Sequence, residues 1–83
     1  MCKYYFMTNK DEILIKFAAK IRTERIKRNL SQENFAEILG FHRTYIGMLE
    51  RAERNITLTN LDKIASALNL DIKNLLDFDN ETQ

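Results

Sequence analysis

The chain contains almost none of the residues that sharp turns require: among its 83 residues there are two glycines and no proline. A β-rich domain of this length needs several tight turns, which depend on those two residue types. The sequence therefore predicts helices joined by short connections. Because a chain of this length can build only one small core, we expect a single all-α domain that gains stability from self-association.

Apolar residues recur three and four positions apart in five stretches, which is the spacing of one face of an α-helix. The predicted helices cover residues 9 or 10 to 28, 31–39, 43–51, 58–69 and 71–77. Ser31, Thr57 and Asp71 are the expected capping residues at helix starts, and Asn29 suits a left-handed helix end. The side chains expected to face the core include Ile13, Leu14, Phe17, Ala18, Ile21, Ile26, Phe35, Leu58, Leu61, Ile64, Ala65 and Leu68.

Charge is distributed unevenly, although the formal net charge is only +1. Residues 20–28 carry five basic side chains and one acid, whereas residues 71–83 carry four acids and one lysine. A basic body with an acidic tail favours a polyanionic partner such as nucleic acid. The alternative is that the basic stretch is simply a solvated helix face.

Composition argues against several classes of protein. The single cysteine, Cys2, allows no internal disulfide, and one cysteine with one histidine cannot supply a usual zinc ligand set. No apolar run approaches the length of a membrane span, and the first residues lack the apolar region of a signal peptide. No nucleophile–base pair, paired catalytic carboxylates or phosphate-binding glycine loop is present. We therefore expect no enzyme activity, cofactor, metal or membrane partner, and a cytoplasmic location.

Four residues between positions 36 and 49 meet the packing requirements of a helix-turn-helix. Two helices that cross at about 90–120° need a small side chain where they touch, and Ala36 stands at that position. The turn needs a residue that tolerates positive φ, which Gly40 provides. Ile46 and Leu49, three residues apart, are expected to lock the second helix against the core. In such a motif the second helix enters the DNA major groove by its N-terminal residues.

Over about residues 14–78 the chain resembles the Xre-type helix-turn-helix family of phage-repressor and Cro-like DNA-binding domains. The resemblance is carried by NLSQENFAEILGF, YIGMLERAERN and TLTNLDKIASALNLDIKNLL, and HRTYIGMLERAERNIT is most similar to controller proteins of restriction–modification systems. The family usually has glycine where Ala52 stands, so we expect the third helix to be extended or tilted at its end. The resemblance implies a compact five-helix DNA-binding domain of the phage-repressor type over residues 9–78. Residues 1–8 would be a poorly ordered extension and residues 79–83 an acidic tail.

The resemblance also implies a set of DNA contacts. The expected base contacts are Arg43, Thr44, His42, Met48 and Arg51. The expected phosphate contacts are Gln32, Tyr45, Gly47, Arg54, Asn55 and Arg25. Arg25 is further expected to pair with Glu50 and so to brace the third helix. Arg43 can bind guanine O6 and N7 with both arms of its guanidinium, the alternative being a phosphate contact, and His42 is expected to act first as a helix cap.

The last helix has more apolar residues than a short terminal helix needs. Those assigned to a two-fold interface are Leu70, Ile72, Leu75, Leu76 and Phe78, the alternative being that all five complete the core of a single chain. One such domain covers only about 3–5 base pairs, so a homodimer is expected to bind a palindrome in double-stranded DNA. RNA polymerase is a further candidate partner, through Glu33 and Glu37.

The function expected from this resemblance is sequence-specific control of transcription. As the controller protein of a restriction–modification system, the protein would bind its own promoter, activating it at low concentration and repressing it at high concentration. The alternatives within DNA binding are a phage-type or chromosomal repressor and an antitoxin-like autoregulator. From another class, the chain could be a helical protein-interaction module without DNA binding.

Overall fold

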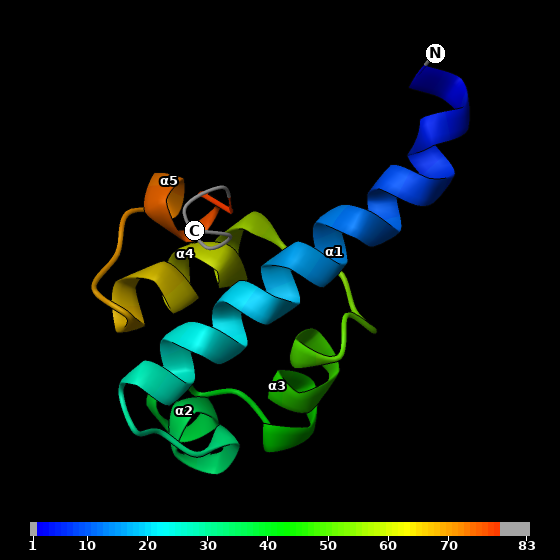
Figure 1. Ribbon diagram of the computed structural model, residues 1–83. Coiled ribbons are helices and arrows are strands. Elements are labelled where there is room, and N and C mark those ends of the chain that lie inside the picture. The colour runs from blue at the N-terminus through cyan, green and yellow to red at the C-terminus, as the bar shows by residue number, and fades with distance from the viewer. Residues whose placement is uncertain (1, 79–83) are drawn as a thin grey trace.

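The computed structural model describes residues 2–78, with side chains from Glu12 onward. Its helices are α1 (Cys2–Lys27), α2 (Gln32–Leu39), α3 (Arg43–Glu50), α4 (Leu58–Ala67) and α5 (Ile72–Leu75), and no strand occurs within the described range. The long α1 crosses the view of Figure 1, with α2 and α3 below it and α4 and α5 above it and to the left, and α2 packs against both α3 and α4. The all-α helix-turn-helix architecture predicted from the sequence is confirmed.

Helix α1 begins at Cys2, so the start predicted at Asn9 or Lys10 is wrong. Residues 2–9 contain neither glycine nor proline, so nothing in the sequence forces the helix to start later. The predicted end of α2 and the predicted starts of α3 and α4 agree with the structure, and the remaining predicted helix ends lie one or two residues outside the observed ones. Residues 1–8 were expected to be a poorly ordered extension, and that expectation stays a prediction, because the side chains of these residues are not among those described. The acidic tail 79–83 lies outside the described residues as well.

The four longer helices end in the same way, in a Schellman motif. One or two residues after each helix end stands a residue with positive φ, namely Asn29 (58°), Gly40 (76°), Ala52 (61°) and Asn69 (60°). The next backbone N–H then donates to a carbonyl five residues back, from Leu30 to Arg25, Phe41 to Ala36, Glu53 to Met48 and Leu70 to Ala65. The expected extension of α3 is therefore wrong, because Ala52 itself adopts the left-handed conformation in which glycine is usual.

Two of the predicted helix caps are present. The Ser31 hydroxyl accepts a hydrogen bond from the Asn34 backbone N–H at 3.0 Å, and the Thr57 hydroxyl accepts one from Asn60 at 3.1 Å. Asp71 and His42 occupy the corresponding positions with extended backbone, but their side chains make no capping hydrogen bond. For His42 the reason is that an imidazole is too long for the short side-chain loop that a cap requires.

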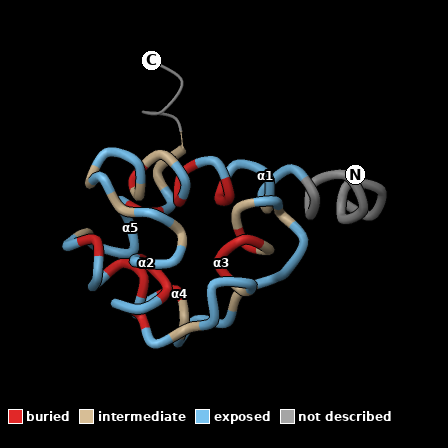
Figure 2. Tube along the Cα trace, turned by 90° about the horizontal axis from the view of Figure 1, so that it is seen from below, coloured by how far each residue is buried: buried red, intermediate tan, exposed pale blue. Residues whose placement is uncertain are grey.

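The core lies between α1 on one side and the inner faces of the other helices (Figure 2). Its fully buried large side chains are Ile21, Phe35, Ile46, Leu49, Ile64, Leu68 and Leu75. Ile13, Ile26 and Leu58, which were predicted to face inward, are exposed. Ile26 follows Ile21 by five residues, about 140° around the helix, and Leu58 is the first residue of α4.

Much of the basic stretch in residues 20–28 is used inside the protein. Glu24 is buried and accepts a hydrogen bond from Arg28 Nη1 at 2.6 Å, with Lys20 Nζ at 3.6 Å and Lys27 Nζ at 3.3 Å. Arg28 Nη2 also donates to the Leu68 carbonyl at the end of α4 (2.7 Å). Burial alone would raise the pKa of the Glu24 carboxyl, but the hydrogen bonds from Arg28 and Lys27 outweigh it and lower that pKa. Arg28 thus ties α1 to α4, whereas the pairs of Glu24 lie along α1 itself, so this stretch is not simply a solvated face.

The ion pair expected between Arg25 and Glu50 joins α1 to the end of α3. Arg25 Nε donates to Glu50 Oε2 at 2.7 Å and Nη2 to Oε1 at 3.0 Å, while Nη1 donates to the Leu30 carbonyl at 2.7 Å. The two side chains are only 11% and 2% exposed. The bracing geometry expected of Arg25 is therefore present. Because all three guanidinium nitrogens are engaged within the protein, its expected phosphate contact stays a prediction.

Replacing Ala52 with glycine is expected to stabilise the fold. The left-handed conformation costs a non-glycine residue about 1 kcal/mol, and the greater freedom of glycine in the unfolded chain cancels part of that gain. We expect Ala52→Gly to raise the free energy of unfolding by about 0.5 kcal/mol, measured by urea denaturation. Ala19→Gly, the same change at an exposed position within α1, should lower it by about 1 kcal/mol. A loss of stability in Ala52→Gly would contradict this account.

Removing Arg25 is expected to destabilise the protein strongly, since it leaves the Glu50 carboxylate buried without its main cation. We expect Arg25→Met to lower the free energy of unfolding by about 3 kcal/mol. The double variant Arg25→Met/Glu50→Leu should recover much of this loss, because no unpaired charge then stays buried. Equal stability of the single variant and the wild type in urea denaturation would show that the pair does not brace α3.

Candidate nucleic-acid interface

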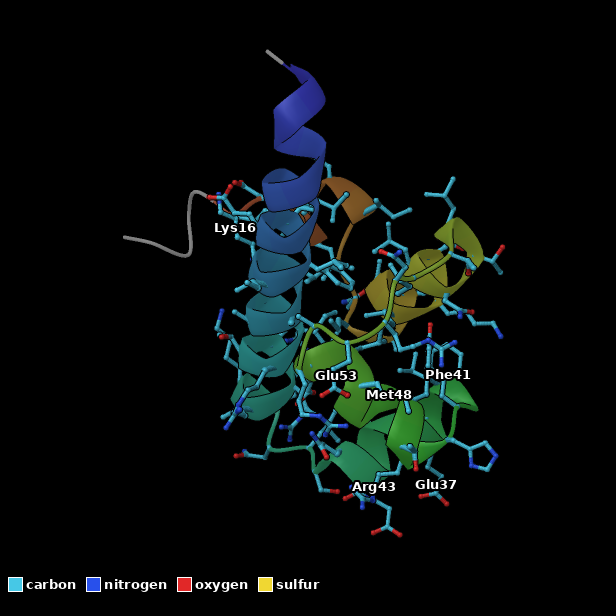
Figure 3. All side chains as sticks on the ribbon, turned by 90° about the vertical axis from the view of Figure 1, so that its right-hand side faces the viewer. Lys16, Glu37, Phe41, Arg43, Met48 and Glu53 are labelled. Carbon is cyan, nitrogen blue, oxygen red and sulfur yellow. The ribbon has the colours of Figure 1, made fainter. Side chains whose placement is uncertain are left out.

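The start of α3 is exposed, whereas its opposite face is fixed in the core. His42, Arg43 and Thr44 are exposed, and Ile46 and Leu49 are almost completely buried. Figure 3 shows the Arg43 side chain at the edge of the molecule, away from the core. This is the arrangement expected of a recognition helix, because the residues that anchor it in the core are different from those that face outward and can contact DNA.

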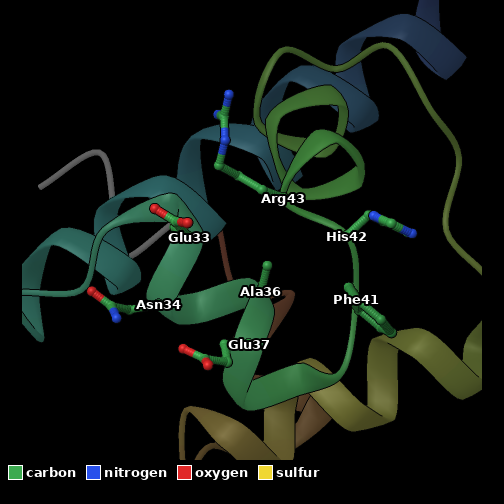
Figure 4. A pocket seen from close by; sticks show the side chains of 7 residues that line it. All are labelled: Glu33, Asn34, Ala36, Glu37, Phe41, His42 and Arg43. Carbon is green, nitrogen blue, oxygen red and sulfur yellow. The ribbon is translucent and has the colours of Figure 1, made fainter.

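A shallow groove runs between α2 and the start of α3 (Figure 4). It is lined by Glu33, Asn34, Ala36, Glu37, Phe41, His42 and Arg43. Ala36 lies at the bottom, as the predicted close contact between the two helices requires, and is buried. Arg43 and His42 point away from each other on either side of the helix start.

A chain of hydrogen bonds connects the brace to the exposed tip of α3. Glu50 Oε1 accepts from Gln32 Nε2 at 3.0 Å, and Gln32 Oε1 accepts from Arg43 Nη1 at 3.3 Å. The start of α2 is thereby tied to both ends of α3. In this arrangement both ends of the Gln32 side-chain amide are hydrogen-bonded within the protein. A phosphate at the α2 N-terminus would therefore bind the backbone N–H groups of the first turn, or would replace one of the two hydrogen bonds of Gln32.

Tyr45 is half-buried and held on several sides. Asn60 Nδ2 donates to its hydroxyl at 3.0 Å, and the ring of Phe41 meets its ring edge-to-face with 5.1 Å between centroids. Arg54 lies over the same ring at 5.8 Å, and Lys63 lies over Phe41 at 5.5 Å. The hydroxyl proton of Tyr45 is left to donate to an outside acceptor. Sequence patterns did not indicate the roles of Asn60 and Lys63, because α4 approaches the turn only in the folded chain.

The end of α3 carries an exposed ion pair between Arg51 and Glu53. Arg51 Nε and Nη2 donate to the two Glu53 carboxylate oxygens at 3.0 and 3.1 Å. These hydrogen bonds raise the pKa of Arg51 and lower that of Glu53, so both are charged at neutral pH. The Arg51 guanidinium lies over Gly47, with Nη1 3.1 Å from the position a Cβ would occupy. Gly47, which was expected to contact a phosphate, is buried as a result.

The remaining predicted contact residues lie at the surface in differing degrees. Arg54 and Asn55 are exposed in the loop after α3, and Met48 is half-buried with its sulfur 3.8 Å from Arg54 Nη1.

Within the described residues no helix is long and apolar enough to cross a membrane. The same part of the chain holds no group of three or more histidine, cysteine, aspartate or glutamate side chains that could bind a metal ion.

Comparison with known proteins gives concordant matches. Control protein C.BamHI of Bacillus amyloliquefaciens is 47% identical over 73 residues, which cover 87% of this chain and 88% of that protein. Control protein C.SmaI of Serratia marcescens is 54% identical over 59 residues, covering 71% and 70% respectively. The crystal structure of the restriction–modification controller protein C.AhdI from Aeromonas hydrophila matches with a TM-score of 0.72 and 40% identity, covering 75% of this chain and 94% of that chain.

The family model for the helix-turn-helix domain HTH_3 matches residues 21–75. That range includes α2 and α3 together with the helices that hold them, so the match covers the whole DNA-binding motif. The family resemblance predicted over about residues 14–78 is thereby confirmed. The chain belongs to the HTH_3 helix-turn-helix family of DNA-binding transcription regulators, within which it is similar to restriction–modification control proteins.

Proposed function

We propose that the protein is the controller of a restriction–modification system and binds operators at its own promoter. The observation that carries this proposal is the exposed start of α3, where Arg43 and Thr44 project from a helix braced at both ends. The identity to control proteins over most of the chain supports the choice of system. Such a regulator acts in the bacterial cytoplasm, where its operator DNA lies.

In the proposed complex, α3 reads base edges and its neighbours hold the backbone. Arg43 is placed to bind guanine O6 and N7, and the Thr44 hydroxyl or methyl faces an adjacent base. His42, Met48 and Arg51 are the further proposed base contacts. The proposed phosphate contacts are Gln32 with the α2 N-terminus, Tyr45, Arg54 and Asn55. Arg25 and Gly47, which are covered, are left out of this set.

A homodimer is proposed to bring two such helices to successive major grooves, about 34 Å apart. Ile72 and Leu76 are one helical turn apart and are 37% and 40% exposed. Leu70 and Phe78 are half-buried beside them, packed against the core. Leu75 is completely buried in the core of its own chain, so it cannot contribute to the interface to which it was assigned. An isologous interface around Ile72 and Leu76 buries apolar surface that a single chain leaves in water.

Regulation is proposed to follow protein concentration. A strong operator would fill first and activate the promoter, and a weaker one would fill later and repress it. Glu33 and Glu37 are exposed beside the start of α3, which makes them the proposed contacts for RNA polymerase.

A chromosomal or phage-type repressor and an antitoxin-like regulator share the same DNA-binding geometry. If the chain were instead a protein-interaction module without DNA binding, it would show no salt-dependent affinity for duplex DNA.

The decisive experiment is a footprint on the DNA upstream of the gene across a protein titration. Two protected blocks that fill in order would support the controller function, and an unprotected region would refute autoregulation. Arg43→Ala is expected to weaken binding to the protected DNA about 10- to 100-fold, because a bidentate base contact is lost. Arg22→Ala, an exposed arginine on α1, is the matched control and should change affinity little. Equal affinity of Arg43→Ala and wild type would exclude Arg43 as a reader.

The dimer interface can be tested without DNA. Leu76→Asp places a charge in the proposed apolar contact and is expected to shift the protein to monomer in sedimentation equilibrium. Ile38→Asp introduces the same charge at an exposed apolar position on α2 and should leave the association constant unchanged. If Leu76→Asp dimerises as well as the wild type, the interface lies elsewhere.

A further inference from the structure

The end of α3 departs from the other helix ends of the described chain in one residue. After the left-handed residue, a Schellman motif usually places an apolar side chain against the helix. Leu30, Phe41 and Leu70 occupy this place after α1, α2 and α4, and each packs against the core. After α3 the same place is taken by Glu53, which is exposed. The Glu53 side chain therefore does not complete the helix end.

The turn brings the Glu53 carboxylate to Arg51 in a bidentate geometry. Both carboxylate oxygens accept from the guanidinium, at 3.0 and 3.1 Å, and the two side chains are 52% and 56% exposed. Guanine O6 with N7, or a phosphate, offers a guanidinium the same pair of acceptors. Because the guanidinium also lies along α3 over Gly47, Arg51 is held at the proposed DNA-facing surface by an acceptor of the protein itself.

We infer that Glu53 holds Arg51 away from the DNA phosphates until a guanine of an operator takes the place of the Glu53 carboxylate. This inference rests on the proposed DNA-binding function and on Arg51 as one of its base contacts. Non-specific binding depends on cations that neutralise phosphates. While Arg51 stays paired with Glu53, the pair adds no net positive charge, so one cation is removed from non-specific binding. At an operator, a guanine that offers two acceptors takes the place of the carboxylate.

Replacing Glu53 with glutamine keeps its shape and removes its charge. On an unrelated duplex, Glu53→Gln is expected to bind about three- to tenfold more tightly than wild type, a gain of the size of one exposed ion pair. The slope of log affinity against log salt should steepen by about 0.9, since Arg51 then neutralises one more phosphate. On the upstream DNA of the gene the slope should stay unchanged, while the affinity should rise by a similar factor, because the wild type must also break the pair there.

Two further variants separate this role from a general charge effect. Glu53→Gln in an Arg51→Ala background should give no gain on the unrelated duplex, because no arginine is left to release. Glu12→Gln, which neutralises an exposed acid on α1, should change neither affinity nor slope. A gain that persists without Arg51, or no gain in Glu53→Gln itself, overturns the inference while leaving DNA binding intact. If the wild type binds neither duplex at low salt, the proposed function fails, and the inference fails with it.

Discussion

The Arg25–Glu50 pair is the interaction on which the geometry of the DNA-facing surface depends. It fixes the end of α3 to α1, and through Gln32 the same carboxylate fixes the start of α2 and the Arg43 side chain. A helix of eight residues has little stability of its own. Its orientation must therefore come from outside, from Ile46 and Leu49 below it and from this polar network at its side.

The fold could be predicted from the sequence at positions where a local steric requirement allowed only one kind of residue. Ala36, Gly40, Ile46 and Leu49 each answer a local steric demand, and the structure places them as expected. Predictions failed where the outcome depended on a neighbour distant in sequence. Leu58 and Ile26 fit an apolar stripe, but no other helix covers them. Ala52 could not be recognised as a left-handed residue, because its side chain gives no preference for that conformation.

The candidate site followed the same rule. Exposure of Arg43 and Thr44 could be expected from their place at the start of a short helix, whereas the partners of charged side chains could not. The charge of residues 20–28 suggested a polyanion, yet Lys20 and Arg28 are directed to Glu24. Arg25 and Gly47 match the family pattern of contacts, but packing covers both. Which charged residues pair within the protein and which stay available to a partner is therefore decided by the packing of the helices and could not be predicted from the sequence.

The two faces of α3 are independent in a way that matters for the evolution of operator recognition. Its inward residues and its ionic brace hold the helix, while Arg43, Thr44 and Met48 take no part in the apolar core. Exchange of these outward residues leaves the apolar core unaltered, so related proteins can diverge in the DNA sequence they recognise at little cost in folding. Two restriction–modification systems in one cell could in this way keep separate regulatory circuits on the same backbone.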